Sequence, residues 1–317
     1  MILLQDIEAA EARIRPYIYE TPLEESLVLS EQTGAHVFLK CEHLQRTGSF
    51  KFRGALNKIL SLSEAERTKG VIAASTGNHG QGVALAAKIV DIPTTIYVPH
   101  DASPMKLKSI RSLGAQVQIC DGDCLAAETR ARDVAENKER VFISPYNDQT
   151  VIAGQGTIGL ELFRQNKSLD AVFVSVGGGG LISGIASYLK QKSLTTQIIG
   201  CYPENAPIMV ECIKAGKIIP IAEQSTLSDA TAGNLEPGSI TFPLCRDFID
   251  QHVLVSEDEI KQAMRLLAET ERMIVEGAAG VALAAFLKMA SSLKGKNVAV
   301  VLCGRNINFS KFIEVVK

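Results

Sequence analysis

Short runs rich in valine and isoleucine alternate with longer segments of helical periodicity along most of this chain. Because parallel strands need a crossover connection, usually a helix, this alternation predicts repeated βα units. The fold class is therefore expected to be α/β, with open, twisted, mostly parallel sheets flanked by helices. The predicted strands are residues 36–40, 70–74, 94–99, 116–120, 171–176, 197–202 and 297–303. The predicted helices are residues 78–90, 105–113, 125–137, 151–165, 180–190, 257–271 and 277–290, with a further helical segment from Lys51.

The length and charge of the chain restrict its class and its partners. Its 317 residues suffice for about two domains at roughly 150 residues each. With 33 basic and 35 acidic residues the net charge is -2, and no lysine- or arginine-rich block occurs, so nucleic acid is not expected as a partner. No apolar run approaches the roughly 18 residues of a membrane span, and Asp6, Glu8 and Glu11 interrupt the N-terminus, which argues against a signal peptide.

The seven cysteines are scattered, odd in number and form no CxxC pair. They predict reduced thiols in a cytoplasmic protein rather than disulfides. Cys120 and Cys124 have no neighbouring histidine, so no metal site is expected.

Four consecutive glycines, Gly177 to Gly180, lie between a predicted strand and a predicted helix. Their backbone N–H groups can converge on one ligand at the positive end of the helix dipole, which favours a phosphate site. A simple connecting turn would need only one or two glycines. The run is neither a P-loop, because no GK[ST] follows, nor a dinucleotide fingerprint, because the GxGxxG spacing is not met.

Lys51 lies between Phe50 and Phe52 at the start of a helical segment. Two aromatic neighbours would desolvate its ammonium and favour the neutral amine that forms a Schiff base. From this run alone, a solvated surface lysine is the more common outcome.

Two further polar segments follow predicted strands. The run Ser75-Thr-Gly-Asn-His79 offers hydroxyls, an amide and backbone N–H groups that suit a carboxylate, although a simple N-cap would use the same residues. Cys303 opens a polar run after the last strand, at the edge where α/β sheets place ligands. It is either a buried apolar thiol or a weak hydrogen-bond partner for a ring nitrogen.

Together these runs resemble one known family. The segments SFKFRGA, STGNHGQG, VIAGQGTIGLE, GGGGLISGIA and VEGAAGVALAA occur in order over nearly the whole chain. The chain resembles the fold type II, tryptophan synthase β-like pyridoxal phosphate enzymes, within the threonine/serine dehydratase and serine racemase group. The resemblance implies a large domain of residues 1–68 and 148–317 and a small domain of residues 69–147, with the cofactor in the cleft between them. It also implies no C-terminal regulatory domain, hence no feedback control by isoleucine, and a homodimer.

The resemblance also implies roles for individual residues. Lys51 would bind the cofactor as a Schiff base and move the Cα proton, with Thr76 as a further catalytic group. The implied cofactor-binding residues are Lys51, Phe50, Asn78, Gly177, Gly178, Gly179, Gly180, Glu276 and Cys303. The implied substrate-binding residues are Ser75, Thr76, Gly77, His79 and Gln155.

The implied activity is β-elimination from a 3-hydroxy amino acid such as threonine or serine, giving a 2-oxo acid and ammonia. Thr76 stands where racemases of the group have serine, so serine racemase activity remains an alternative. The carboxylate pair that binds a cation in those racemases is replaced by Pro203 and Met209. Most dehydratases of the group have glycine at the position of Arg305. An arginine there resembles the dehydratases of hydroxyectoine utilisation, so the identity of the substrate is left undecided. A non-catalytic amino-acid sensor is the alternative from another class.

Overall fold

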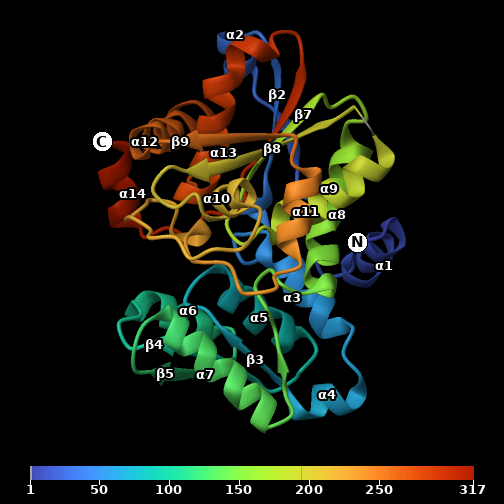
Figure 1. The fold of residues 1–317 in the computed structure, drawn as a ribbon, viewed down its shortest axis with the longest axis vertical. Helices are drawn as coiled ribbons and strands as arrows, with labels where there is room; N and C mark the ends of the chain where they lie inside the picture. Colours follow the sequence, from blue (N-terminus) through green and yellow to red (C-terminus); the bar gives the residue numbers. More distant parts are fainter. Residues whose placement is uncertain (1, 194) are drawn as a thin grey trace.

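The computed structural model describes residues 2–193 and 195–317, which form two separate sheets. The strand order is β1-β2-β10-β7-β8-β9 in the larger sheet and β5-β4-β3-β6 in the smaller one. Within the described residues every strand pairing is parallel except that of β1 with β2. The predicted fold class is therefore confirmed. Figure 1 shows the smaller sheet and its helices below the larger one, with α3 (Lys51–Leu60) at their junction.

The larger sheet carries the main hydrophobic core. Helix α13 packs on β7, β8 and β10, while α9 packs on β7 and β8 and lies beside α8. The strands are β1 (Leu23–Glu25), β2 (His36–Lys40), β7 (Ala171–Ser175), β8 (Gln197–Pro203), β9 (Gln251–Val255) and β10 (Asn297–Val301). The helices are α1 (Leu4–Ile14), α2 (Leu27–Thr33), η1 (Glu42–Leu44), α8 (Gln149–Gln165), α9 (Gly180–Lys192), α10 (Ile208–Ala215), η2 (Asp229–Thr231), α11 (Thr241–Phe248), α12 (Glu257–Leu266), η3 (Leu267–Glu271), α13 (Gly277–Met289), η4 (Ala290–Leu293) and α14 (Phe309–Val316).

The smaller sheet has a core of its own. Residues outside the sheet region complete that core, among them Ile14, Ile18 and the α3 residues Phe52 and Leu56. A third cluster lies under α7 on the other face of the sheet. The strands are β3 (Val71–Ala74), β4 (Thr94–Pro99), β5 (Gln116–Cys120) and β6 (Val141–Phe142). The helices are α4 (Glu64–Lys69), α5 (Asn78–Ile89), α6 (Pro104–Ser112) and α7 (Cys124–Asn137).

Local sequence signals explain several helix starts. The Asp148 side chain caps α8 by accepting hydrogen bonds from two backbone N–H groups, and Ser63 and Ser256 open α4 and α12 with capping boxes. The predicted helix at 257–271 is wrong at its end, because α12 stops at Leu266 and a π turn follows. That turn closes at Arg272, which has a left-handed backbone with φ 60°.

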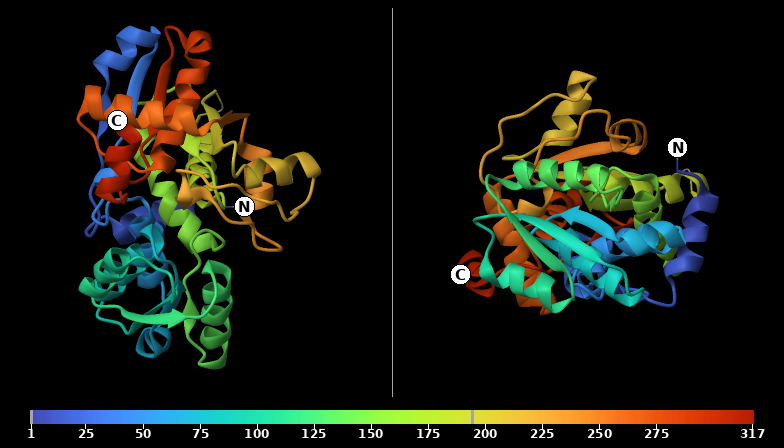
Figure 2. Two further views of the ribbon diagram at one scale, coloured as in Figure 1. Left: turned by 90° about the vertical axis from the view of Figure 1, so that its left-hand side faces the viewer. Right: turned by 90° about the horizontal axis from the view of Figure 1, so that it is seen from below.

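The segment of residues 217–242 is mostly irregular but contains η2 and the first two residues of α11. In the left view of Figure 2 this yellow-to-orange part of the chain projects from the upper body.

Candidate functional site

Lys51 is the first residue of α3, and its amine is held at a specific place. Nζ donates a hydrogen bond to the carbonyl oxygen of Pro145 at 2.8 Å and lies 5.2 Å from the centre of the Phe50 ring. Desolvation lowers the pKa of this amine to about 8, against attraction from Cys303 and Glu276, which raises it. Near that pH much of the amine is neutral, and the neutral form is the nucleophile and base.

Helix α5 packs directly on the lysine. His79 is buried, and its Nε2 lies 2.8 Å from the carbonyl oxygen of Ile143. Desolvation and the nearby Lys51 charge lower the pKa of His79 to about 3, so this imidazole is neutral. A Cβ at Gly82 would lie 3.2 Å from the Lys51 backbone carbon. A side chain here would therefore require the two helices to move apart by a few tenths of an ångström.

The loop Ser75, Thr76 and Gly77 joins β3 to α5. The Ser75 hydroxyl accepts a hydrogen bond from the Gly77 N–H at 3.1 Å, and all three residues are half-buried. A Cβ at Gly77 would meet no atom of the described chain within 4 Å. Open space therefore lies at the N-terminus of α5, where the helix dipole favours an anion.

Asn78, Glu276 and Asn306 form one buried hydrogen-bond network. Asn78 Nδ2 donates to both Glu276 oxygens at 2.8 and 3.0 Å, and Asn306 Nδ2 donates to Asn78 Oδ1 at 2.6 Å. The Asn306 N–H donates to Glu276 Oε2 at 3.1 Å. The pKa of Glu276 is raised to about 7, and desolvation by burial is the largest of the effects that act on it. Every side-chain atom of Asn78 that can hydrogen-bond is thus oriented by a partner.

The glycine run Gly177 to Gly180 connects β7 to α9. Gly179 is the N-cap of α9 and has φ 83°, a left-handed backbone that glycine adopts freely. A Cβ at Gly178 would lie 2.5 Å from the Tyr146 ring, and one at Gly177 would lie 2.8 Å from Thr231. Glycine at these positions lets Thr231 and Tyr146 pack directly against the backbone. The N–H groups at the N-terminus of a helix such as α9 favour an anion.

The segment before Lys51 is tied to the end of β10. The Phe50 N–H donates to the Cys303 carbonyl oxygen at 3.1 Å, and Ser49 forms an antiparallel bridge with Gly304. Cys303 is buried, and desolvation raises the pKa of its thiol well above the ordinary value. The thiol is therefore neutral.

Gln155 lies on α8 and contacts the helix of Lys51. Its Oε1 accepts a hydrogen bond from the Gly54 N–H at 3.2 Å, and its Nε2 has no partner among the described residues. The structure therefore brings Gln155 to α3 rather than into hydrogen-bond contact with the Ser75 loop.

Several residues at the site were not predicted from the sequence. They are Pro145, which accepts the Lys51 hydrogen bond, Tyr146 on the glycine run, and Asn306. Asn306 could have been suspected, because it follows Cys303 in the same polar run. Pro145 and Tyr146 carry no local signal, since their role arises from contacts with distant residues.

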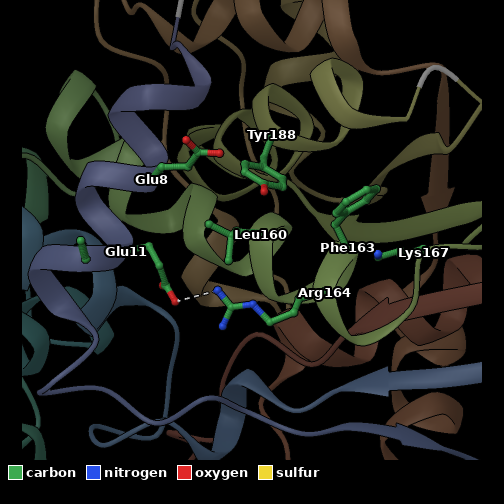
Figure 3. Close-up of a pocket in the computed structure, with 8 residues that line it drawn as sticks. Glu8, Glu11, Leu160, Phe163, Arg164, Lys167 and Tyr188 are labelled. Carbon is green, nitrogen blue, oxygen red and sulfur yellow. Dashed lines mark hydrogen bonds and ion pairs between the residues drawn. The ribbon is translucent and has the colours of Figure 1, made fainter.

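One hollow in the described chain borders the site. That hollow has about 270 Å³ and is lined by residues that include Thr47, Gln81, Arg305 and Asn306. A second hollow has about 450 Å³ and lies between α1, α8 and α9, away from Lys51. Figure 3 shows that an ion pair of Glu11 with Arg164 crosses this second hollow, at 3.5 Å.

These features fit pyridoxal phosphate. The cofactor needs a neutral amine, a phosphate cradle and a partner for its ring nitrogen. The desolvated amine of Lys51, the glycine run at the N-terminus of α9 and the neutral Cys303 thiol match those needs.

Comparison with known proteins leads to the same class. The family described as "Pyridoxal-phosphate dependent enzyme" matches residues 14–304. The chain therefore belongs to the pyridoxal phosphate-dependent enzymes of this family. Among its relatives, L-threonine ammonia-lyase of Thermotoga maritima is 44% identical over 317 residues, covering 100% of this chain and 78% of that protein.

Solved structures agree with this relationship. The processed form of threonine deaminase isoform 2 from Solanum lycopersicum has a TM-score of 0.95 and 38% identity, covering 98% of this chain and 91% of that one. Serine racemase from Dictyostelium discoideum has a TM-score of 0.91 and 37% identity, covering 97% of this chain and 99% of that one.

In residues 2–193 and 195–317, no helix is long and apolar enough to cross a bilayer. Over the same ranges no three histidine, cysteine or acidic side chains gather as metal ligands would. The seven cysteines are all free thiols.

Proposed function

We propose that this chain is a pyridoxal phosphate-dependent L-threonine ammonia-lyase that also accepts serine. It would convert the 3-hydroxy amino acid to a 2-oxo acid and ammonia. The carrying observation is the desolvated amine of Lys51, hydrogen-bonded at 2.8 Å beside the glycine run. The 44% identity with a threonine ammonia-lyase over the whole chain supports the choice of substrate.

The cofactor would be held by residues from several elements. Lys51 would attach it, the backbone of Gly177 to Gly180 would bind its phosphate, and Asn78 would contact its ring hydroxyl. Cys303 would face the ring nitrogen, while Phe50 and Glu276 would border the ring. A neutral thiol neither protonates that nitrogen nor forms an ion pair with it, which favours elimination over transamination.

The protein's own groups carry out the proton transfers. Bound pyridoxal phosphate supplies an electron sink that weakens the Cα–H bond of an attached amino acid. The Lys51 amine, with its pKa near 8, takes the Cα proton. The substrate carboxylate would be bound by Ser75, Thr76 and Gly77. His79 on α5 and Gln155, which contacts Gly54 on α3, are the further residues proposed to bind substrate. The Cβ hydroxyl leaves as water, and water later hydrolyses the C–N bond, so threonine yields 2-oxobutanoate and ammonia without net oxidation.

We propose the domain boundaries from the two separate sheets. Residues 69–147 form the small domain, and residues 1–68 with 148–317 form the large one. We also propose a cytoplasmic homodimer, for which the seven free thiols support a reducing compartment. The molar mass from light scattering tests the dimer.

Serine racemisation is the second candidate. Thr76 has a hydroxyl in the loop before α5, and the chain is 37% identical to a serine racemase. A hydroxyectoine-type dehydratase and a non-catalytic sensor complete the alternatives, and one assay separates all of them.

The test incubates the purified holoenzyme with threonine, serine and 3-hydroxyaspartate and measures 2-oxo acid, ammonia and D-enantiomer. We expect the wild type to form 2-oxobutanoate from threonine. Lys51→Ala should lose at least about 100-fold of this activity and should also lose the yellow absorbance of the wild-type holoenzyme. Lys58→Ala, on the same helix, is the control and should keep wild-type activity.

Other outcomes decide against the proposal. Equal ammonia release by wild type and Lys51→Ala would show that the assigned base is wrong. D-serine formed faster than pyruvate would identify a racemase. A protein that binds amino acids without releasing either product would be a sensor, and turnover of 3-hydroxyaspartate alone would indicate a different dehydratase.

A further inference from the structure

Four charged side chains are fully buried at the junction of α3 with the larger sheet. Lys40, Glu42, Arg53 and Glu161 each have a relative exposure of 0%. They come from four different elements: β2, η1, α3 and α8. Burial of charge costs free energy unless every charge is paired and hydrogen-bonded. A cluster of this kind therefore needs a reason beyond stability.

Arg53 is the member of this cluster on the helix of Lys51. Its guanidinium group binds a carboxylate at each of two edges. Nε and Nη2 donate to the two oxygens of Glu42 at 2.9 and 2.8 Å. Nη1 and Nη2 donate to the two oxygens of Glu161 at 2.8 Å each. Nη1 also lies 3.2 Å from the Thr157 hydroxyl. Because the fork is planar and bidentate on both sides, it fixes the direction of the side chain as well as its charge.

Lys40 shares Glu161 with Arg53 but has no contact of this kind with α3. Its Nζ donates to Glu161 Oε2 at 2.6 Å, to the Thr21 carbonyl oxygen at 2.8 Å and to Gln165 Oε1 at 2.9 Å. Lys40 thus holds Glu161 to the sheet, and Glu161 holds Arg53. This arrangement supplies a matched pair of buried cations, only one of which is on the helix of Lys51.

The contact between α3 and α8 is close, and several polar groups cross it. A Cβ at Gly154 would lie 2.7 Å from the Cα of Gly54, so backbone meets backbone at this point. Gln155 Oε1 accepts a hydrogen bond from the Gly54 N–H at 3.2 Å, and Asn57 Nδ2 donates to the Thr150 carbonyl oxygen at 2.7 Å. Arg53 adds a fully buried, bidentate restraint to these links. Residues two apart on a helix differ by about 200° in direction, so Arg53 and Lys51 project from nearly opposite faces. Any rotation of α3 therefore moves the Lys51 amine.

We propose that Arg53, held by Glu42 and Glu161, is a positioning residue that sets the rotation and register of α3 and so places the Lys51 amine against Pro145. The proposal rests on the proposed function only in taking Lys51 as the reactive amine.

The direct readout is the reactivity of Lys51 itself. The full chain, freed of cofactor, is labelled with an amine-acylating reagent across pH, and the Lys51 peptide is quantified by mass spectrometry. The groups that face this amine are Cys303, Glu276 and His79, all unchanged in the variants. We expect Arg53→Lys to move the labelling midpoint upward, toward that of a solvated lysine. In the holoenzyme, kcat should fall by about 10- to 100-fold with KM little changed.

Lys40→Met is the matched control. It removes an equally buried cation that shares Glu161, so it should lower the unfolding temperature while leaving the labelling midpoint and kcat at wild-type values. If Lys40→Met and Arg53→Lys move the midpoint equally, the cluster is a general buttress and the proposal is wrong. A wild-type midpoint in folded Arg53→Lys would also overturn it.

A milder variant covers the case in which Arg53→Lys does not fold. Thr157→Val removes one contact of the guanidinium and leaves both ion pairs, and it should shift the midpoint in the same direction by a smaller amount. A wild-type midpoint there would count against the proposal. Since labelling needs no turnover, a chain inactive on threonine that still shows the Arg53 shift would contradict the proposed function alone.

Discussion

At the scale of single residues, Glu276 shows how burial and hydrogen bonding oppose each other. Its carboxylate accepts three hydrogen bonds, two from Asn78 and one from the Asn306 N–H, and these lower its pKa. Burial has the larger effect and raises the pKa to about 7. The carboxyl group therefore titrates where the enzyme would work, next to Lys51 and the Cys303 thiol.

This predicts a pH-dependent stability that Glu276→Gln removes. Because the folded-state pKa is raised, the folded chain binds a proton more tightly than the unfolded chain between the ordinary value of 4.5 and about 7. Wild-type stability should fall as pH rises through this window, relative to the variant. The difference is roughly 3 kcal/mol at most, since each pH unit is worth about 1.4 kcal/mol.

Urea unfolding of the cofactor-free chains at several pH values measures it. Curves for wild type and Glu276→Gln that run parallel from pH 4.5 to pH 7 would contradict the assignment.

Residue-scale features were predictable where one short run carries the chemistry. The glycines at 177–180 and the lysine between two phenylalanines were recognisable for that reason, and the structure does show the expected desolvation of Lys51. The Arg53–Glu161 pair spans 108 positions, and Asn306 reaches Asn78 across 228. No local pattern encodes such pairings, so the fold itself is needed to reveal them.

At the scale of elements, the docking of α3 on α8 depends on glycines that helix propensity disfavours. In an exposed helix, alanine in place of glycine would stabilise by roughly 0.5–1 kcal/mol. At Gly54 a Cβ would meet the Gln155 side chain and lie 2.7 Å from the Val151 carbonyl oxygen. Packing therefore opposes propensity at this position.

We predict that packing prevails and that Gly54→Ala destabilises the chain by about 1–3 kcal/mol, as overpacked cores do. The free energy of unfolding from urea titration measures the effect. The wild-type chain is the reference, and a Gly54→Ala variant as stable as wild type would refute the close contact.

Elements were predicted from sequence with unequal success. Strands with a fully buried valine- and isoleucine-rich run, such as β7, agree with the structure to within about one residue. The strands β1 and β6 were missed because, at 3 and 2 residues, they are too short to show a period. The strand β9 was missed because Gln251 and His252 break its apolar pattern at the sheet edge.

At the scale of the whole molecule, an ion pair joins the smaller sheet's helices to the long loop of the larger unit. Arg132 on α7 donates to Glu236 Oε1 at 2.6 Å, and Asn147 donates to Glu236 Oε2 at 2.9 Å. The Asn147 side-chain oxygen Oδ1 accepts a hydrogen bond from the Ile240 N–H at 2.9 Å. The loop at 217–240 is thus fastened to the segment that connects the two sheets.

Arg132→Ala should loosen this loop without unfolding either sheet. The pair is partly exposed, with side-chain exposures of 39% and 22%, so its worth is at most about 1 kcal/mol and falls with salt. We expect proteolysis within residues 217–240 to speed up by up to about fivefold at low salt. Lys69→Ala removes an exposed pair inside the smaller unit and should leave the rate unchanged. If wild type, Arg132→Ala and Lys69→Ala were cleaved at the same rate, the Arg132–Glu236 pair would not restrain this loop.

The strand order of the larger sheet sets an order of assembly on the ribosome. The strand β10, between β2 and β7, is the last strand along the chain. Until residues 297–301 emerge, the pair β1-β2 and the trio β7-β8-β9 have no strand to join them. The smaller sheet needs only residues up to Phe142 and can pair its strands far earlier. The nascent chain therefore carries two unpaired sheet edges late in synthesis, and such edges favour aggregation until β10 pairs with both of them.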